Sequence, residues 1–173
     1  MPEKPSRERL LERLIEASTF GLDDLEQNRQ GRMSGLQRSR LAFMTFTYFG
    51  MCALSLTLAG CTLWLWLTLF KSIPFLTCLI FVILCTYAGY YWLRHALPMW
   101  EDVRSNAVLR ISGPVHLIYV KIANRPPTYA VHYKIAQKFF DMAFLAPQLF
   151  PNDQSCHAYY APRSEIIVGI EPT

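Results

Sequence analysis

Residues 41–93 decide the fold: LAFMTFTYFGMCALSLTLAGCTLWLWLTLF, then Lys71, then SIPFLTCLIFVILCTYAGYYWL. Lys71 is the only charged residue in this stretch, and each flanking run exceeds the roughly 20 residues that a helix needs to cross a bilayer. Because the connection around Lys71 and Pro74 is short, the second helix is expected to return antiparallel beside the first. The sequence therefore predicts a transmembrane helical hairpin over residues 41–97, with both ends on one side.

The composition agrees with a membrane protein that has two small water-facing segments, residues 1–40 and 98–173. The chain is 52% hydrophobic and 17% charged, which is unusual for a soluble domain. A net charge of +4 favours contact with anionic lipid headgroups over nucleic acid. The first apolar run begins too late for a secretory signal peptide. We therefore expect an uncleaved membrane protein. Its predicted partner is the lipid bilayer, and no nucleic-acid partner is expected.

The charges that flank the two runs predict the orientation. Basic residues lie at the outer ends of the hairpin, whereas Lys71 stands alone at the turn: Arg29, Arg32, Arg38, Arg40, Arg94 and Arg104. Because basic flanks stay on the cytoplasmic side, both termini are expected in the cytoplasm of a multi-pass protein of the inner membrane.

The N-terminal segment is predicted to be helical and cytoplasmic. A short amphipathic helix is expected between Ser6 and Gly21, and its apolar stripe fits the membrane surface, the C-terminal domain or a partner protein equally well. Residues 22–28 can add another turn or two before Gly31. The spacing of Ser34 and Gln37 is that of a capping box, which predicts that the first membrane helix begins near Gly35.

Small side chains recur at helical spacing in both membrane runs, and such faces let helices approach closely in lipid. The predicted helix-packing seam consists of Gly50, Ala53, Thr57, Gly60 and Cys61 on the first helix and Cys78, Val82, Cys85 and Gly89 on the second. We expect Gly60 near Val82, Thr57 near Cys85 and Ala53 near Gly89. The four cysteines also suggest a metal or redox site, but without CxxC spacing a packing role is favoured. No metal or cofactor is predicted.

The C-terminal segment changes to a period of two, which is typical of strands. Pro98 is expected to end the second helix, with residues 99–105 as a linker. Strands are predicted at 108–111, 115–122, 128–133, 156–161 and 165–170, with a helix at 134–145. Three strands, a helix and two strands are the element order of a small OB-like barrel, and they also fit a curled sheet. The predicted fold class is therefore membrane α+β: a two-helix hairpin, an N-terminal amphipathic helix and a small barrel-like (OB or SH3-like) domain that carries one helix.

Catalytic groups are sparse in this segment. His116, His132, Cys156 and His157 are the candidates, but adjacent residues of a strand point to opposite faces, so Cys156 and His157 cannot act on each other. A pair of Cys156 with His132 has no support in the sequence, and structural roles are favoured. No catalytic residue is predicted, and the protein is expected not to be an enzyme.

Several short stretches resemble a group of bacterial two-helix membrane proteins with a small C-terminal β domain and no assigned activity. They are Leu25-Glu-Gln-Asn28, Gly31, Ser34, Gln37, Gly113-Pro-Val115, residues 129–133, Tyr159-Tyr-Ala-Pro-Arg-Ser164 and Ile170-Glu-Pro172. In layout the chain is also similar to membrane-anchored OB-domain proteins of the NfeD type, which are thought to organise other membrane proteins. The resemblance implies an architecture, and it carries over no functional residue.

These observations favour a non-enzymatic membrane anchor, scaffold or accessory subunit that presents its β domain to other membrane-protein subunits. The alternative is one subunit of a homo-oligomeric small channel or transporter. The two runs lack the ionisable residues that mark proton relays and coupled transporters. Their threonines could line a path between subunits, although a threonine usually bonds back to its own helix.

Overall fold

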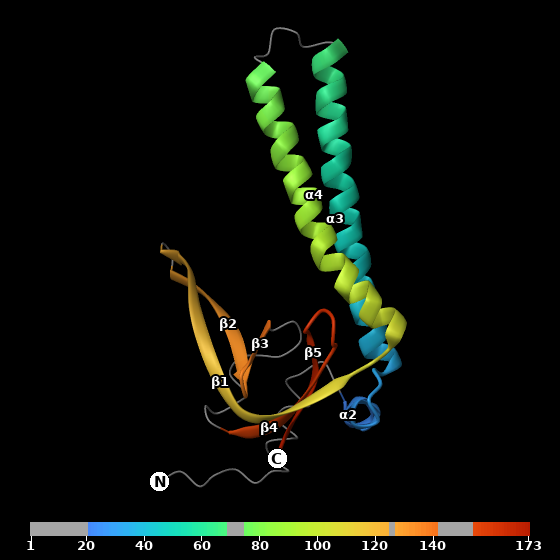
Figure 1. The fold of residues 1–173 in the computed structure, drawn as a ribbon, viewed down its shortest axis with the longest axis vertical. Coiled ribbons are helices and arrows are strands. Elements are labelled where there is room, and N and C mark those ends of the chain that lie inside the picture. Colours follow the sequence, from blue (N-terminus) through green and yellow to red (C-terminus); the bar gives the residue numbers. More distant parts are fainter. Residues whose placement is uncertain (1–20, 69–74, 125–126, 142–153) are drawn as a thin grey trace. The chain divides into compact units, whose positions relative to one another are not determined.

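The computed structural model describes residues 21–68, 75–124, 127–141 and 154–173 and shows an α+β protein (Figure 1). Among these residues the elements are α2 (Leu22–Arg29), α3 (Gly35–Thr68), α4 (Phe75–Ser105), β1 (Leu109–Asn124), β2 (Pro127–Ile135), β3 (Lys138–Asp141), β4 (Ser155–Tyr160) and β5 (Ile167–Pro172). The amphipathic helix predicted after Ser6 lies outside the described residues. The chain divides into a hairpin unit, Ser39–Arg104, and a sheet unit, Met1–Arg38 with Ser105–Thr173.

In the hairpin unit, α3 and α4 lie antiparallel (Figure 1). The ring of Trp66 is 5.2 Å from that of Phe75 at one level, and Phe46 is 6.0 Å from Trp100 at another. Both helices are long and apolar enough to cross a membrane. The predicted pair of long apolar helices is therefore confirmed.

The second helix is longer than predicted, because α4 continues through Pro98 to Ser105. A proline inside a helix removes one backbone hydrogen bond and crowds the preceding turn. Here the buried stripe of α4 runs on past the proline, through Ala96, Met99 and Val103 at steps of three and four. The burial of these side chains offsets the lost bond, so the expected end of the helix at Pro98 and the linker at 99–105 are wrong.

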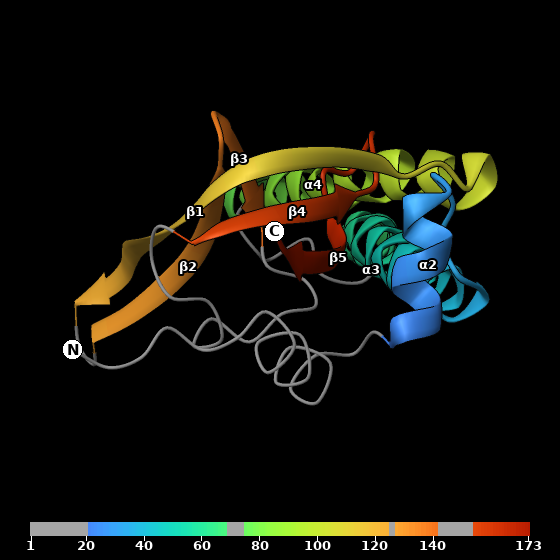
Figure 2. The same ribbon diagram turned by 90° about the horizontal axis from the view of Figure 1, so that it is seen from below.

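The five strands form one antiparallel sheet in the order β3-β2-β1-β4-β5 (Figure 2). Its centre is β1, which pairs with β4 over residues 109–114 and with β2 over residues 115–124. Two separate strands around Gly113-Pro114 were expected, and one continuous strand is found. Pro114 has no N–H to donate, and it lies where β1 changes partners. Gly113 also permits a close approach, since a Cβ there would lie 3.1 Å from the backbone nitrogen of Ala136.

The described strands form an open sheet. In this order β3 pairs with β2 alone and β5 with β4 alone, so β3 and β5 are edges and the ladder does not close. The finding supports the α+β class and a sheet, but no barrel is seen. The last two predicted strands, at 156–161 and 165–170, correspond to β4 and β5 within two residues.

The helix predicted at residues 134–145 is wrong as far as the structure describes it. Lys134 and Ile135 end β2, and Lys138 opens β3 opposite Ile135, so residues 134–141 form a hairpin. The turn places Ala136 at φ 55°, the left-handed region that two-residue hairpin turns use. Burial alternates accordingly, because Phe140 is 1% exposed and Phe139 is 56% exposed. Residues 142–145 lie outside the described part of the chain.

The two faces of the sheet differ in character. Directly opposed residues of antiparallel strands share a face. One face is apolar and forms the core of the unit, and its buried members are Val115, Tyr133, Ile135, Phe140, Cys156, Ala158, Tyr160 and Ile170. The rings of Phe140 and Tyr160 meet edge to face there, 5.1 Å apart. The other face carries polar side chains, including Arg110, Ser112, His157, Tyr159 and Glu171.

Candidate functional site

The N-terminal segment packs against the C-terminal sheet within the sheet unit. Leu25 and Asn28 of α2 are 1% and 2% exposed and lie against Gly169 of β5. A Cβ at Gly169 would lie only 2.6 Å from Nδ2 of Asn28 and 3.2 Å from Leu25. The glycine therefore makes the close approach of α2 to β5 possible.

Backbone contacts extend this attachment. The N–H of Val108 donates to the carbonyl of Gly31 at 3.0 Å, and Arg32 forms an isolated bridge with Ala107. Gly31 has φ 77°, a backbone conformation that glycine adopts without strain. The turn between α2 and α3 is thus joined to the residues that lead into β1.

The start of α3 agrees with the predicted capping box. Oγ of Ser34 accepts from the N–H of Gln37, and Oε1 of Gln37 accepts from the N–H of Ser34, both at 3.1 Å. The same Gln37 side chain donates from Nε2 to the carbonyl of Val168 at 2.9 Å. One glutamine therefore caps the helix and ties its first turn to β5. The tie to β5 was not expected from the sequence.

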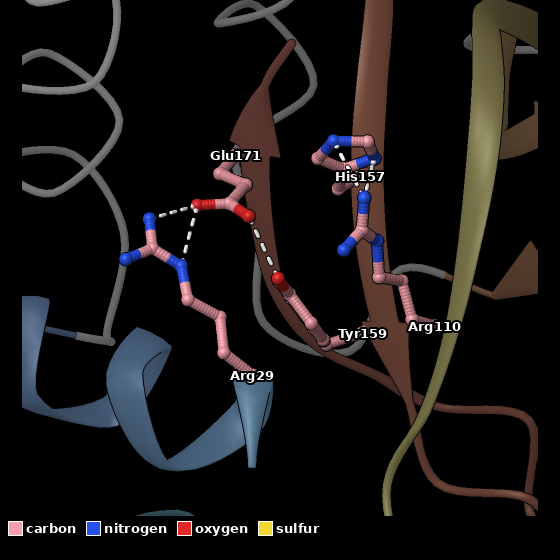
Figure 3. A network of polar contacts seen from close by, with 5 residues as sticks. All are labelled: Arg29, Arg110, His157, Tyr159 and Glu171. Carbon is pink, nitrogen blue, oxygen red and sulfur yellow. Dashed lines mark hydrogen bonds and ion pairs between the residues drawn. The ribbon is translucent and has the colours of Figure 1, made fainter. Parts of the chain in front are cut away.

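A polar network centres on Glu171 of β5 (Figure 3). Arg29 of α2 donates to Oε2 from Nη2 and, at 3.2 Å, from Nε. The hydroxyl of Tyr159 on β4 donates to Oε1 at 2.7 Å. The Glu171 side chain is 5% exposed and that of Arg29 is 53% exposed. A nearly buried carboxylate is thus held by one arginine at the surface and one buried tyrosine.

The network shifts the ionisation of its members. Burial raises the pKa of Glu171, but the hydrogen bonds from Arg29 and Tyr159 lower it by more, so the net pKa lies below its usual value. Burial, together with the bond to Glu171, raises the pKa of Tyr159. At neutral pH the carboxylate is therefore charged and the tyrosine neutral, which is the pattern that these hydrogen bonds require.

A second cluster joins β1 to β4 on the same face (Figure 3). Nη2 of Arg110 lies 2.8 Å from Nε2 of His157, and Oγ of Ser112 lies 2.7 Å from its Nδ1. A neutral imidazole with its proton on Nδ1 satisfies both contacts, since Nε2 then accepts from Arg110 and Nδ1 donates to Ser112. His157 in this way orients an exposed arginine.

Sequence reasoning did not find these two clusters. Arg29 and Glu171 are 142 positions apart, so no local spacing relates them. One signal was present, namely an acidic residue in an otherwise apolar terminal strand, residues 167–172. A carboxylate at such a position needs a partner if it is buried.

The catalytic candidates do not come together. Cys156 is 0% exposed, and burial raises its pKa to about 12, so the thiol stays protonated at neutral pH. By register Cys156 lies on the apolar face, opposite Gly113, whereas His132 is opposite Ile118 on the other face. His157 contacts Arg110 and Ser112 instead. The arrangement therefore does not pair a thiol with a base at these positions.

The structure places the residues of the predicted seam differently on the two helices. Gly89 packs against α3, since a Cβ there would lie 3.1 Å from Cδ2 of Leu56 and 3.6 Å from the carbonyl of Cys52. On α4 the predicted residues Cys78, Val82, Cys85 and Gly89 are all buried or half-buried. On α3 the predicted residues Gly50, Ala53, Thr57, Gly60 and Cys61 are all exposed, and no described atom lies within 4 Å of a Cβ built at Gly50 or Gly60.

The face that α3 turns to α4 is adjacent to the predicted one. Its less exposed residues repeat at steps of four and three, and they are Leu41, Thr45, Tyr48, Cys52, Ser55, Ala59 and Thr62. This repeat of 3.5 residues is the one by which two long helices stay in contact. Gly89 thus lies near the predicted level of α3, beside Cys52 and Leu56 rather than Ala53. Gly60 and Thr57 lie on a different face of α3 from the one that packs against α4. Their expected pairings with Val82 and Cys85 are therefore not seen.

We expect Gly89→Leu to destabilise the hairpin by about 1 to 3 kcal/mol, because the new side chain enters a tight helix contact. Gly60→Leu is the matched control and should have little effect, since its side chain would enter open space. Thermal unfolding of the two variants in one detergent, at one protein concentration, makes the comparison. Equal losses would show that Gly60 also lies in a packed interface.

Among the described residues, no group of three or more His, Cys, Asp or Glu side chains is placed to hold a metal ion. The chain matches no protein-family model, no curated protein and no solved structure.

Proposed function

We propose that the protein is a non-enzymatic anchor, scaffold or accessory subunit of the inner membrane, which presents its sheet unit to partner proteins in the cytoplasm. One observation carries the proposal: the N-terminal segment and the C-terminal sheet form a single folded unit. The bond from Gln37 to Val168 and the ion pair of Arg29 with Glu171 support a position of both segments on the same side of a membrane. The chain thus builds one water-facing module from its two ends.

The helices support an anchoring role. Residues 41–68 and 75–93 contain no Asp, Glu, Lys or Arg, and they expose many large apolar side chains, such as Phe43, Leu54 and Leu84. Apolar side chains exposed along a helix of this length suit contact with lipid. The basic residues at the outer ends of the hairpin favour a cytoplasmic position for the module.

The homo-oligomeric channel or transporter subunit is the competing proposal. Its support is the exposed face of small residues on α3, which leaves room for a helix of another copy. Against it, seven serine and threonine hydroxyls in the helices bond to their own backbone. Thr45, Thr47, Ser55, Thr57, Thr62, Thr68 and Thr86 each donate to the carbonyl four residues earlier. Hydroxyls engaged in this way give little reason to infer a polar path.

The test is purification of the full chain through a C-terminal tag in mild detergent, with quantified subunit stoichiometry. We expect a different membrane protein to co-purify with the tagged chain at a fixed molar ratio. Phe140→Ala, which removes a core ring from the sheet, should abolish this association, whereas Phe139→Ala should preserve it. A complex made of several copies of this chain alone would support the channel proposal instead.

The same tagged chain tests the orientation. In intact spheroplasts, protease added outside should leave a C-terminal tag uncut, and it should cut the tag once the membrane is opened. Cutting before the membrane is opened would place the module on the outer side.

A further inference from the structure

The polar face of the sheet carries a row of basic and histidine side chains. Arg110 and Ser112 on β1 are opposite Tyr159 and His157 of β4, and further along β1 His116 is opposite Lys134 of β2. His132 follows on the same face, opposite Ile118. We call Arg110, Ser112, His116, His132, Lys134 and His157 the basic strip. Its members are exposed or half-buried.

Arg110 and Lys134, the two strongest cations of this strip, form no ion pair with an acidic side chain that the structure describes. Within the described side chains Arg110 bonds to His157, and Lys134 lies over the ring of Phe139, 5.4 Å from its centroid. Glu171, the acid that β5 places on this face at the Arg110 end, is already bonded to Arg29 and Tyr159. By contrast, Lys138, which alternates with Phe139 along β3, pairs with Glu165 at 2.8 Å. Arg110 and Lys134 therefore carry positive charge that no described acidic side chain neutralises.

The spacing of the charges indicates the size of the ligand. Arg110 and His116 are six residues apart on one strand, about 20 Å at 3.3 Å per residue, and Lys134 is opposite His116. A single phosphate group is too small to contact both ends. At the far edge of the sheet the register also places an acid, Asp141, opposite His132. The excess positive charge thus lies between Arg110 and Lys134, and it suits a surface that repeats negative charges.

The membrane proposed to hold the hairpin is such a surface, and the chain connects it directly to the strip. From Leu93, the end of the uncharged run, α4 continues for twelve residues to Ser105, about 18 Å of helix, and Arg110 follows five residues later, at most about 18 Å of extended chain. A tether of this length keeps the local concentration of lipid headgroups high, whereas a soluble ligand has no such advantage.

We propose that the basic strip binds the phosphate groups of anionic phospholipid headgroups of the same membrane. The guanidinium of Arg110 contacts His157, which in turn contacts Ser112, and it donates hydrogen bonds to phosphate oxygens, whose geometry arginine matches with two parallel N–H donors. Lys134 contributes a second point of attachment along the strip. The inference rests on the membrane location in the proposed function, and it adds a lipid-binding role for the sheet.

The test uses the full chain in nanodiscs, with Ser155→Cys carrying a fluorescent dye. Ser155 is exposed and opposite Pro114, on the face of the strip. Alanine replaces Cys52, Cys61, Cys78 and Cys85, and Cys156 is retained because it is buried. A headgroup-attached nitroxide quenches the dye when this face meets the lipid. Incorporation into nanodiscs, read by gel filtration, tests the membrane location separately from quenching.

We expect stronger quenching in nanodiscs that contain phosphatidylglycerol than in phosphatidylcholine alone. Arg110→Glu should lower the equilibrium constant for binding of the sheet face to lipid at least about fivefold. This factor corresponds to about 1 kcal/mol, the contribution of one cation at an anionic surface. Arg110→Lys should retain most of the quenching. Arg32→Glu is the matched control, because it makes the same charge change at an exposed residue outside the strip. Lys134→Glu tests the strip independently if Arg110→Glu does not fold.

Equal quenching in the two lipids, or an equal loss in Arg32→Glu, would overturn the proposal. Raising the ionic strength from about 0.1 M to about 1 M should also remove the difference, since the Debye length falls from about 10 Å to about 3 Å. The last measurement adds inorganic phosphate. If phosphate reduces the quenching more than sodium chloride does at equal ionic strength, the strip binds a single phosphate ligand and not a lipid surface.

Discussion

Phe140→Ala is expected to lower the free energy of unfolding of the sheet unit by about 3 to 5 kcal/mol, the usual cost of removing a buried aromatic ring. Phe140 is 1% exposed and contacts the ring of Tyr160. Its neighbour Phe139 is 56% exposed, and its ring is contacted by Lys134. Phe139→Ala should therefore cost less than about 1 kcal/mol. The pair is matched in chemistry and differs only in the face of β3 that is changed.

Cys156 can report the unfolding of the sheet unit. It is 0% exposed on β4, and its burial protects it from thiol reagents until the sheet opens. With Cys52, Cys61, Cys78 and Cys85 replaced by alanine, pulsed thiol labelling in increasing denaturant measures the opening of the sheet. Similar losses of unfolding free energy in Phe140→Ala and Phe139→Ala would contradict the hairpin of β2 and β3. Only a strand places these adjacent side chains on opposite faces, one buried and one exposed.

Arg29→Ala is expected to destabilise the sheet unit by about 1 to 3 kcal/mol at neutral pH. Breaking a fully buried ion pair costs about 3 to 5 kcal/mol. The Arg29 side chain is 53% exposed, so solvent screening reduces the value here. The variant leaves Glu171 charged and nearly buried, with Tyr159 as its remaining described hydrogen-bond donor. In a Glu171→Gln background the same change should lower the free energy of unfolding much less, because no buried charge is left without its partner.

The pH dependence of this effect follows from the pKa of Glu171. In the native protein this pKa lies below the ordinary value of 4.5, so the carboxylate stabilises the fold above that pH, and the stabilisation is lost as the pH falls through the lowered pKa. Without Arg29, burial dominates and the pKa is expected to rise. Stability is then lost as the pH rises through the new pKa.

The penalty of Arg29→Ala should therefore be largest near pH 7 and shrink below about pH 4. Labelling of Cys156 with a dipyridyl disulfide, which reacts in acid as well as at neutral pH, can follow it. A penalty that is constant with pH, or one that persists in the Glu171→Gln background, would exclude the buried carboxylate as its cause.

Features that depend on short stretches were predictable from the sequence. The absence of charge over residues 41–70 and 72–93 sets the helical hairpin, because an uncharged run of that length has few other stable forms. The reciprocal bonds of Ser34 and Gln37 are local, so their spacing alone located the start of α3. The last two strands were also found, since turn residues and apolar alternation bound them on both sides.

Other features depend on contacts between distant parts of the chain, and those required the tertiary structure. Phe139 and Phe140 fit a helical and a strand pattern equally well, and the pairing of Tyr133 with Phe140 decides for the strand. Small residues lie on two faces of α3, and the position of Leu56 beside Gly89 decides which face packs. Arg29 and Glu171 meet only because α2 lies against β5. Local propensities are weak compared with the burial of side chains, so distant partners determine these choices.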